Sequence, residues 1–354
     1  MNQITLSASF LFLGALAFAF CPRTDEHPSV ASRVLATYAP APESRSPERR
    51  AGAARAFLDS LGGELRARCA LALDSPERSK WTNLPPSANE AGARLGDLDE
   101  GQLERACELL ATVLSPQGYA KLRDIMLADD RLLPGGAPRP GFGAESFWLV
   151  LFGSPSADGE WALQLDGHHI ALNLSFSGER MTMSPSFIGA QPSAYERGGA
   201  QIVPLRGEVD GAFALIDSLT EEQREAAVLG AQRGQIAAGA GRDGFVPEPE
   251  GLACHTLDGK QRALLTGLLR QFVGDLPEPS AAEHMRALEA QIDAMVFAWN
   301  GPTQNPSDVS YRVQGPSVLV EYACQDLGGD PLDHLHSMYR DPGNEYGVRF
   351  GEKR

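Results

Sequence analysis

The spacing of apolar residues divides the first half of the chain into a helical part and a strand-rich part. Up to about residue 130, apolar residues recur every three to four positions, which is the period of an amphipathic helix. The expected helices are Ala51 to Leu73, Asp99 to Leu114 and Pro116 to Ala128, with a loop around Trp81 to Pro86. From Ser146 to about Gly189 short apolar runs are separated by Gly, Ser, Pro and Asp, which is typical of an antiparallel meander. The expected strands are Ser146 to Phe152, Trp161 to Asp166, His169 to Phe176 and Arg180 to Met183.

Helical and strand-like patterns both return in the second half. The expected helices there are Val209 to Gly230, Leu257 to Val273 and Ala281 to Asn300. The expected strands are Tyr311 to Gln314, Val318 to Tyr322 and a run around Leu335 to Tyr339. Of the 354 residues, 43% are hydrophobic and 22% are charged, which is the composition of a globular protein. We therefore expect a single large α+β domain over residues 51–354, with helices packed against an antiparallel sheet.

Three of the expected helices carry the same capping pattern. An Asp or Thr follows a leucine, and a Gln stands three residues later, which is the arrangement of a capping box. The three pairs are Asp99 with Gln102, Thr220 with Gln223, and Asp258 with Gln261. Each box stabilises the start of a helix by about 1 kcal/mol, so the pattern predicts three helix starts.

The N-terminus indicates export. Residues 4–20 form an apolar stretch that is too short for a confident membrane span and that contains Ala17-Phe18-Ala19, a typical cleavage signal. We predict a signal peptide over residues 1–19, a Pro/Ser-rich linker over residues 20–50, and a periplasmic or extracellular protein. Lipid anchoring at Cys21 is an alternative, as is an uncleaved apolar tail on a cytosolic protein.

The net charge bears on the partners of the protein, and the cysteine spacing bears on zinc ribbons and disulfides. The formal net charge of -15 would repel nucleic acids and anionic membranes, so we expect neither as a partner. The five cysteines are far apart and include no C-x-x-C pair, which argues against a zinc ribbon. In an exported protein, Cys69 with Cys107 and Cys254 with Cys324 would be the obvious disulfides, although spacing cannot choose among pairings.

Four of the seven histidines lie in two short clusters, at His168 and His169 and at His334 and His336. On an extended segment the one-residue spacer places His334 and His336 on the same face, whereas adjacent residues of a regular strand point to opposite faces. A bulge at Gly167 could turn one of His168 and His169 toward the others. We therefore predict a site of three histidines, comprising His334, His336 and one of the first pair, for a divalent transition metal such as zinc.

Two further residues could take part in chemistry at such a site. Glu321 is a carboxylate within an apolar run, where it could be a metal ligand, a hydrogen-bond partner of a bound histidine or a general base. Arg340 follows the second histidine cluster and could bind an anionic substrate. Equally, Arg340 could fasten a turn by pairing with Asp341 or Glu345.

Several functions are compatible with these residues. A metal with an open coordination position favours a metal-dependent hydrolase that acts on a small-molecule substrate. The alternative is a non-catalytic extracytoplasmic protein that binds a metal or a small ligand. Metal-free acid–base chemistry and a purely structural role of the histidines also stay open. The chain has no G-x-S-x-G, H-E-x-x-H, phosphate-loop or G-x-G-x-x-G motif, which disfavours serine hydrolases, zincins, ATPases and Rossmann enzymes.

A series of short blocks resembles one family in its order along the chain. The blocks are Trp81 to Pro85, Phe147-Trp148 with Phe152 to Pro155, Gly167 to Asn173, Pro185 to Ala190, and His334 to His336 with Arg340 to Pro342. Together they resemble the domain of unknown function 3500 family over roughly residues 55 to 350. The resemblance implies one domain, frequent export and recurrent histidine motifs, but no established reaction. This chain has Glu345-Tyr346-Gly347 where the family leads us to expect Asp-Tyr-Gly.

Overall fold

The structure is a computed structural model that describes residues 28–40, 45–85, 91–137, 139–327 and 329–351. The expected signal peptide and Cys21 lie outside the described residues. The helices are α1 (Val30–Thr37), α2 (Pro47–Ser60), α3 (Gly63–Cys69), α4 (Glu100–Val113), α5 (Pro116–Asp129), α6 (Arg206–Ser218), α7 (Glu221–Ala227), α8 (Gly259–Val273) and α9 (Ser280–Glu289). The strands are β1 (Ala70–Leu71), β2 (Ala93–Arg94), β3 (Phe147–Gly153), β4 (Glu160–Gly167), β5 (Ile170–Ser177), β6 (Arg180–Thr182), β7 (Ser186–Ala190), β8 (Tyr195–Arg197), β9 (Ala200–Ile202), β10 (Val228–Gly230), β11 (Leu252–Ala253), β12 (Val296–Asn300), β13 (Ser310–Gly315), β14 (Val318–Cys324) and β15 (Leu335–Arg340).

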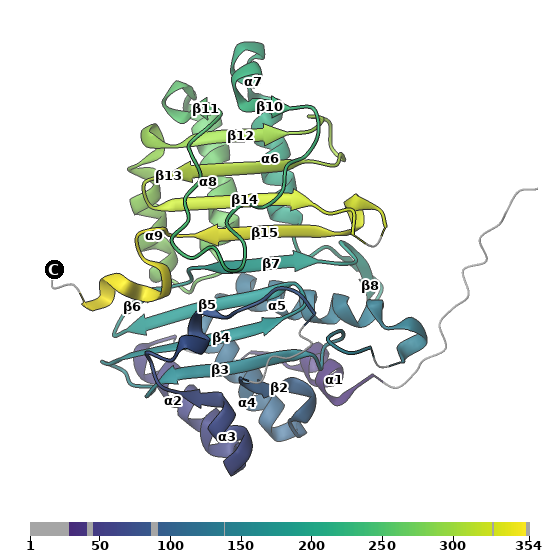
Figure 1. The fold of residues 1–354 in the computed structure, drawn as a ribbon, viewed down its shortest axis with the longest axis vertical. Helices are drawn as coiled ribbons and strands as arrows, with labels where there is room; N and C mark the ends of the chain where they lie inside the picture. Colours follow the sequence, from purple (N-terminus) through teal and green to yellow (C-terminus); the bar gives the residue numbers. More distant parts are fainter. Residues whose placement is uncertain (1–27, 41–44, 86–90, 138, 328, 352–354) are drawn as a thin grey trace, which may run out of the picture.

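Most of the strands form one large sheet (Figure 1). Its main order is β1-β3-β4-β5-β7-β15-β14-β13-β12-β10, so β15 from the end of the chain lies beside β7 from the middle. The strands between β3 and β12 pair antiparallel, whereas the edge strands β1 and β10 pair parallel to β3 and β12. The fold is therefore α+β with a mostly antiparallel sheet, as the sequence predicted.

The two faces of the sheet are covered differently. Helices lie behind the sheet in the view of Figure 1, and long loops cross in front of it. A large apolar core joins helices such as α4 and α8 to the sheet through Leu110, Leu268, Leu163 and Val320. The other face carries a smaller apolar cluster of Trp81, Ala171, Phe187 and Met338. Side chains alternate along β15, so His336 and Arg340 lie on the same face as Met338, the loop-covered one.

Three expected helices are shorter than the sequence predicted. The segment expected as one helix to Leu73 is divided into α2 and α3, because Gly62-Gly63 interrupts it. The expected helix Val209 to Gly230 breaks at Thr220, whose capping box begins α7. The expected helix Ala281 to Asn300 ends at Glu289, and its β-branched and aromatic end forms β12 instead.

The expected Pro/Ser-rich linker contains ordered structure. Within residues 20–50, Val30–Thr37 forms α1, and Ala31, Val34 and Leu35 are buried in the large core. Helix α2 begins at Pro47, where the Ser46 hydroxyl accepts a hydrogen bond from the N–H of Arg49. The folded body therefore begins before residue 51, since α1 buries apolar surface that a free tether would leave in water.

Other local predictions had mixed outcomes. All three predicted capping boxes are formed, at Asp99, Thr220 and Asp258. The two disulfides considered from the sequence are absent, because the four described cysteines are buried free thiols. Within the described ranges, no helix combines the length and apolar character that crossing a membrane would require.

Candidate metal centre

The turn between β4 and β5 positions the first histidine pair. Gly167 at the end of β4 pairs with Ile170 at the start of β5, so His168 and His169 occupy the tight turn between them. The sequence instead placed His169 within a strand. The φ angle of His169 is 68°, a left-handed conformation that side chains other than glycine adopt rarely. Because the pair lies in a turn, strand alternation does not decide which histidine faces the second cluster.

Hydrogen bonds fix the second cluster at the start of β15. Nδ1 of His334 lies 2.8 Å from the carbonyl oxygen of Leu327. Just before it, a carboxylate oxygen of Asp333 accepts a hydrogen bond of 2.9 Å from the N–H of Ser193, which follows β7. His336 lies within β15, opposite Ala323 of β14 and Gly189 of β7. The second cluster is therefore held by neighbouring strands on both sides.

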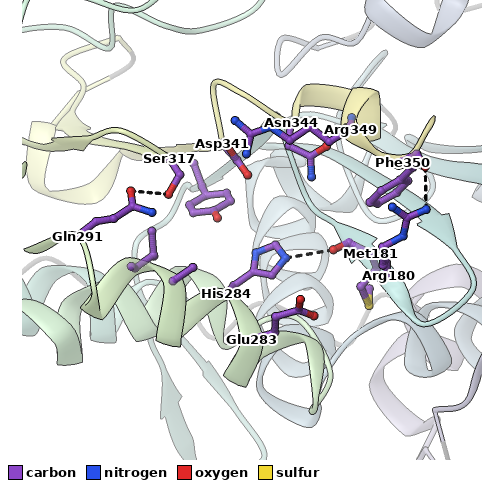
Figure 2. A pocket seen from close by; sticks show the side chains of 13 residues that line it. Arg180, Met181, Glu283, His284, Gln291, Ser317, Asp341, Asn344, Arg349 and Phe350 are labelled. Atoms are coloured by element: carbon purple, nitrogen blue, oxygen red, sulfur yellow. Dashed lines mark hydrogen bonds between the residues drawn. The ribbon is translucent and has the colours of Figure 1, made fainter. Parts of the chain in front are cut away.

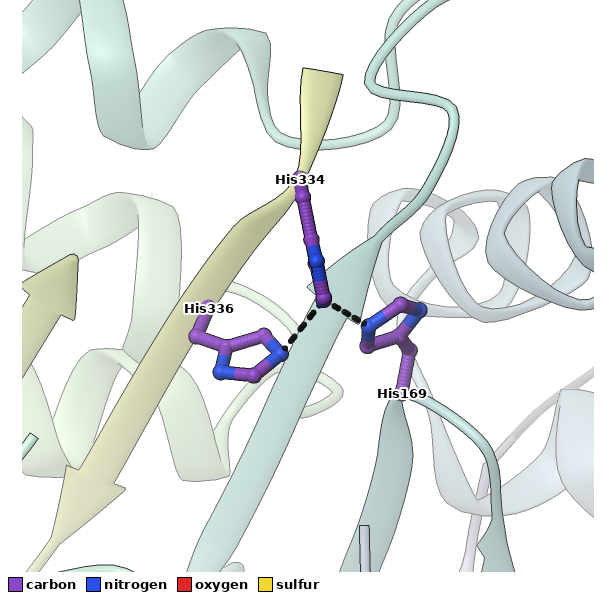
Figure 3. A group of neighbouring side chains, drawn as sticks. All are labelled: His169, His334 and His336. Carbon is purple, nitrogen blue, oxygen red and sulfur yellow. Dashed lines mark hydrogen bonds between the residues drawn. The ribbon is translucent and has the colours of Figure 1, made fainter. Parts of the chain in front are cut away.

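Three histidine side chains from these two segments converge on one point (Figure 3). Nε2 of His334 lies 2.8 Å from Nε2 of His169 and 3.0 Å from Nε2 of His336. The structure thus places His169, and not His168, against the second cluster. Zinc–nitrogen bonds of 2.0–2.1 Å with angles between 90° and tetrahedral separate ligand nitrogens by about 2.9–3.4 Å, so the two distances from His334 are close to those between zinc ligands.

The hydrogen-bonding capacity of these rings also favours a cation. Nδ1 of His334 faces a carbonyl oxygen, so it carries the proton in the neutral ring and Nε2 keeps only a lone pair. Nε2 atoms of both His169 and His336 face that single lone pair. One in-plane lone pair cannot align well with two donors, whereas a metal ion would accept a lone pair from each of the three rings.

Burial keeps the three imidazoles neutral. It lowers the pKa of His169 well below the ordinary value, and the neighbouring histidines lower it further. Burial also lowers the pKa of His334, which its contact with the Leu327 carbonyl opposes only in part. The same cause lowers the pKa of His336 to about 3. Neutral imidazole is the form that binds metals, so near pH 7 the three rings are in the protonation state that can coordinate a metal.

His168 pairs with a carboxylate that the sequence analysis missed. Nδ1 of His168 lies 2.5 Å from Oδ1 of Asp129, the last residue of α5, and the other carboxylate oxygen accepts a hydrogen bond of 2.6 Å from Gly143. Burial raises the pKa of Asp129, and the contact with His168 opposes that rise. The His168 ring lies against that of His169, with 3.7 Å between centroids and 36° between the ring planes. Asp129, His168 and His169 form a second group of potential metal-binding side chains. An acidic residue in the last turn of a helix, where the dipole disfavours it, was the only signal in the sequence.

Glu321 and Arg340 lie on the same face of the sheet as His336. Their side chains contact a loop and not the histidines. The carboxylate of Glu321 accepts hydrogen bonds from the N–H groups of Ala237 and Ala238, the shorter of 2.8 Å. The guanidinium of Arg340 donates to the carbonyl oxygen of Ala238 at 2.8 Å and to the carboxylate of Glu345. Neither residue belongs to the histidine groups among the described residues. Together they fasten the loop over residues 231–251 to β14 and β15.

Comparison with known proteins identifies the family. The model of a protein family of unknown function, DUF3500, matches residues 43–348, which is most of the chain. The chain belongs to the DUF3500 family. No curated protein and no solved structure matches it significantly. The family membership confirms the resemblance seen in the sequence, and the description of the DUF3500 family assigns no reaction.

Loss of the Glu321 carboxylate should destabilise the loop and spare the histidines. Glu321→Ala leaves the N–H groups of Ala237 and Ala238 without their acceptor, which should lower the free energy of unfolding by about 1–3 kcal/mol. Amide exchange over residues 231–251 should become faster in the DUF3500 protein. Metal titration should give an unchanged affinity. Weaker metal binding in a variant that stays folded would instead place Glu321 at the metal.

Gly189 leaves the space that the His169 ring occupies. A Cβ at this position would lie 2.8 Å from Cδ2 of His169 and 2.7 Å from the carbonyl oxygen of Leu335. Gly189→Ala should therefore displace His169, weaken metal binding about tenfold or more and lower the free energy of unfolding by about 1–3 kcal/mol. The matched control is Gly267→Ala in α8, where a Cβ would meet no atom within 4 Å and should be stabilising by about 0.5–1 kcal/mol. Wild-type metal affinity in Gly189→Ala would argue against His169 as a ligand.

Proposed function

We propose that this DUF3500 protein binds one divalent transition metal, zinc being the first candidate, through His169, His334 and His336. The observation that carries the proposal is the approach of three Nε2 atoms from two distant segments, at 2.8 and 3.0 Å. Their lowered pKa values support it, because protons do not compete with the metal near neutral pH. Ligand type alone is compatible with other divalent metals.

We further propose that the metal serves as the centre of a hydrolase. Three protein ligands leave a coordination position free, which distinguishes catalytic zinc sites from closed structural ones. A bound metal would supply an acidified water or polarise a carbonyl or phosphoryl oxygen of a small-molecule substrate. His336 is partly exposed while His169 and His334 are buried, so solvent and substrate would approach from the side of His336.

The protein's own residues would orient the ligands. The contact of His334 with the Leu327 carbonyl selects the tautomer whose Nε2 is free, and the Asp129–His168 pair supports the adjacent ring of His169. Glu321 and Arg340 were expected to act in catalysis. Their contacts support a simpler proposal, in which they hold the loop beside the site.

A non-catalytic binding protein is the second candidate. One observation favours it: a cavity of about 360 Å³ in this structure is lined by α9 and the C-terminal segment and does not include the three histidines. Export through the N-terminal apolar stretch, with one domain that extends from α1 to the C-terminal segment, fits either function. Both functions involve a small molecule or a metal ion as partner. Nucleic acids are not expected as partners, because the net charge of -15 would repel them.

Hydrolysis assays on defined metal forms separate the two candidates. Metal-free protein, zinc-loaded protein and the His334→Ala/His336→Ala variant would be compared on aryl ester, phosphoester and amide substrates. The hydrolase proposal predicts turnover that requires zinc and is absent from the variant. Tight stoichiometric metal without turnover would support the binding protein. The absence of metal binding after reconstitution would overturn the metal site and the hydrolase, and would leave only a protein that binds a small ligand.

A further inference from the structure

A polar cavity lies at the other end of β15, on the helix side of the sheet. It has a volume of about 360 Å³ and is bounded by β6, α9 and the segment that follows β15 (Figure 2). Tyr339, which lines it, belongs to the large core, whereas His336 contacts Phe187 of the smaller cluster on the opposite face. The cavity is therefore separate from the histidine site. Its volume falls in the range of about 300–1,000 Å³ that is typical of small-molecule sites.

Several side chains at the cavity have hydrogen-bonding groups to spare. The Asn344 side chain accepts through its oxygen from the N–H of Arg349 at 3.1 Å, and Gln291 accepts through its oxygen from the Ser317 hydroxyl at 3.0 Å. Within the described part of the chain, the NH₂ groups of both amides have no partner. Two free donor groups of this kind, each with two N–H bonds, are available to a ligand.

His284 of α9 lines the cavity. Figure 2 shows its ring on α9, below Asp341 and Asn344. One ring nitrogen, Nε2, lies 3.1 Å from the carbonyl oxygen of Met181. For the other nitrogen, Nδ1, the described residues provide no partner. The ring is thus fixed by one nitrogen and presents the other for binding.

Two almost buried groups add hydrogen-bonding capacity. Tyr339 is only 4% exposed, and its hydroxyl has no hydrogen-bond partner among the described residues. Asp341 is 9% exposed, and its carboxylate accepts through one oxygen from the N–H of Gly343 at 3.2 Å. Burial raises the pKa of Asp341, with Arg349 and His284 acting in the opposite direction. The Tyr339 hydroxyl and the Asp341 carboxylate therefore keep hydrogen-bonding capacity that a polar ligand in the cavity could use.

The charges at the cavity cancel. Two arginines, Arg180 and Arg349, stand against two carboxylates, Glu283 and Asp341. The Arg180 guanidinium is already engaged, because it donates to the carbonyl oxygen of Phe350 at 2.7 Å and lies 5.1 Å from the centre of the Phe350 ring. A bound anion would therefore find no unopposed positive charge, and a bound cation would find no unopposed negative charge.

We propose that this cavity binds an uncharged, hydroxyl-rich ligand, namely a small saccharide. Each sugar hydroxyl both donates and accepts, which matches the amide donors of Asn344 and Gln291 and the acceptor oxygen of Asp341. The same cavity is lined by Leu288 and Phe350, which offer apolar surface to the C–H groups of a sugar ring. The site thus combines polar and apolar recognition of a neutral molecule.

Ligand-observed NMR on the full chain tests this proposal. Saturation transfer would be measured with glucose, galactose, N-acetylglucosamine, maltose and cellobiose, and with glucuronate as the anionic comparison. We expect saturable binding of at least one neutral sugar and no preference for glucuronate. The Gln291→Ala/Asn344→Ala variant should bind that sugar at least about tenfold more weakly, because two donors are lost.

Two further variants locate the binding. Ala287 is an exposed residue of α9 that lines the cavity, so Ala287→Phe should fill the cavity without removing a hydrogen bond and should abolish binding. Gln304→Ala, which removes an exposed glutamine outside the cavity, should bind as the wild type does. The proposal would be overturned by no binding of any neutral sugar, by a preference for glucuronate, or by undiminished binding in both cavity variants.

Discussion

Lys121→Met should lower the free energy of unfolding by about 3–5 kcal/mol, because it leaves two buried carboxylates without their counter-charge. Nζ of Lys121 in α5 lies 2.6 Å from a carboxylate oxygen of Glu208 in α6 and 2.8 Å from one of Asp275, which follows α8. The third partner is the carbonyl oxygen of Gln271 at 2.7 Å. Lys121, Glu208 and Asp275 are buried, so solvent cannot replace the lost contacts.

Lys121, Glu208 and Asp275 form a buried triad in which the lysine and the two carboxylates shift each other's pKa values. Burial alone would lower the pKa of Lys121, but the carboxylates of Asp275 and Glu208 outweigh burial and raise it. Burial raises the pKa of both carboxylates, and Lys121 opposes the rise. Lys121 therefore favours the charged forms of Glu208 and Asp275. Its contacts join the helices of the first half of the chain to those of the second.

An exposed ion pair provides the control for the Lys121 variant. Lys80 and Glu77 are 2.6 Å apart, as are Lys121 and Glu208, but their side chains are 62% and 37% exposed. Lys80→Met should change the free energy of unfolding by less than about 1 kcal/mol. Urea denaturation of both variants measures the difference. A loss below about 1 kcal/mol for Lys121→Met would show that the triad does not hold the halves together.

His334→Ala/His336→Ala should weaken metal binding by more than about a thousandfold. Loss of a single residue that only supports a metal ligand costs about 10- to 100-fold in affinity, and this variant removes two of the three ligands themselves. The fold should be retained, because β15 keeps its backbone pairing with β14 and β7. Isothermal titration with zinc measures the affinity, and circular dichroism with urea denaturation measures the fold.

Controls distinguish a metal site from a histidine core. His255→Ala, which removes an exposed histidine before α8, should bind zinc with wild-type affinity. His169→Asn keeps a residue that tolerates the left-handed conformation of the turn while removing the third ligand, and it should also lose metal. Unfolding of both ligand variants, with no metal bound by the wild type, would show that the histidines are structural.

Local sequence signals predicted much of the fold. The capping boxes at Asp99, Thr220 and Asp258 gave three helix starts. Short apolar runs gave β3, β4, β5, β13, β14 and β15, but not the central strand β7. Periodicity failed at Val296–Asn300, which lies a short connection beyond α9, because short apolar runs fit a buried helix and a buried strand equally well. Helix α1 was not predicted, because the composition of residues 20–50 suggested a flexible tether. The helix forms where its apolar residues pack against the large core.

The candidate site was predicted in part. The one-residue spacing of His334 and His336 correctly predicted two rings on one side, since that geometry is local. The choice between His168 and His169 depends on the φ angle of a turn, and the role of Asp129 depends on where α5 ends. Glu321 and Arg340 contact a loop that is distant in sequence and has no periodic pattern. Such contacts are set by the tertiary fold.

The metal content of the purified protein tests the central claim most directly. Elemental mass spectrometry would be applied to the protein as purified and again after reconstitution with zinc and removal of excess metal. The three converging histidines predict close to one transition-metal ion per chain, and its loss from His334→Ala/His336→Ala. A protein that holds no metal even after reconstitution would contradict the account and leave a hydrogen-bonded histidine cluster in its place.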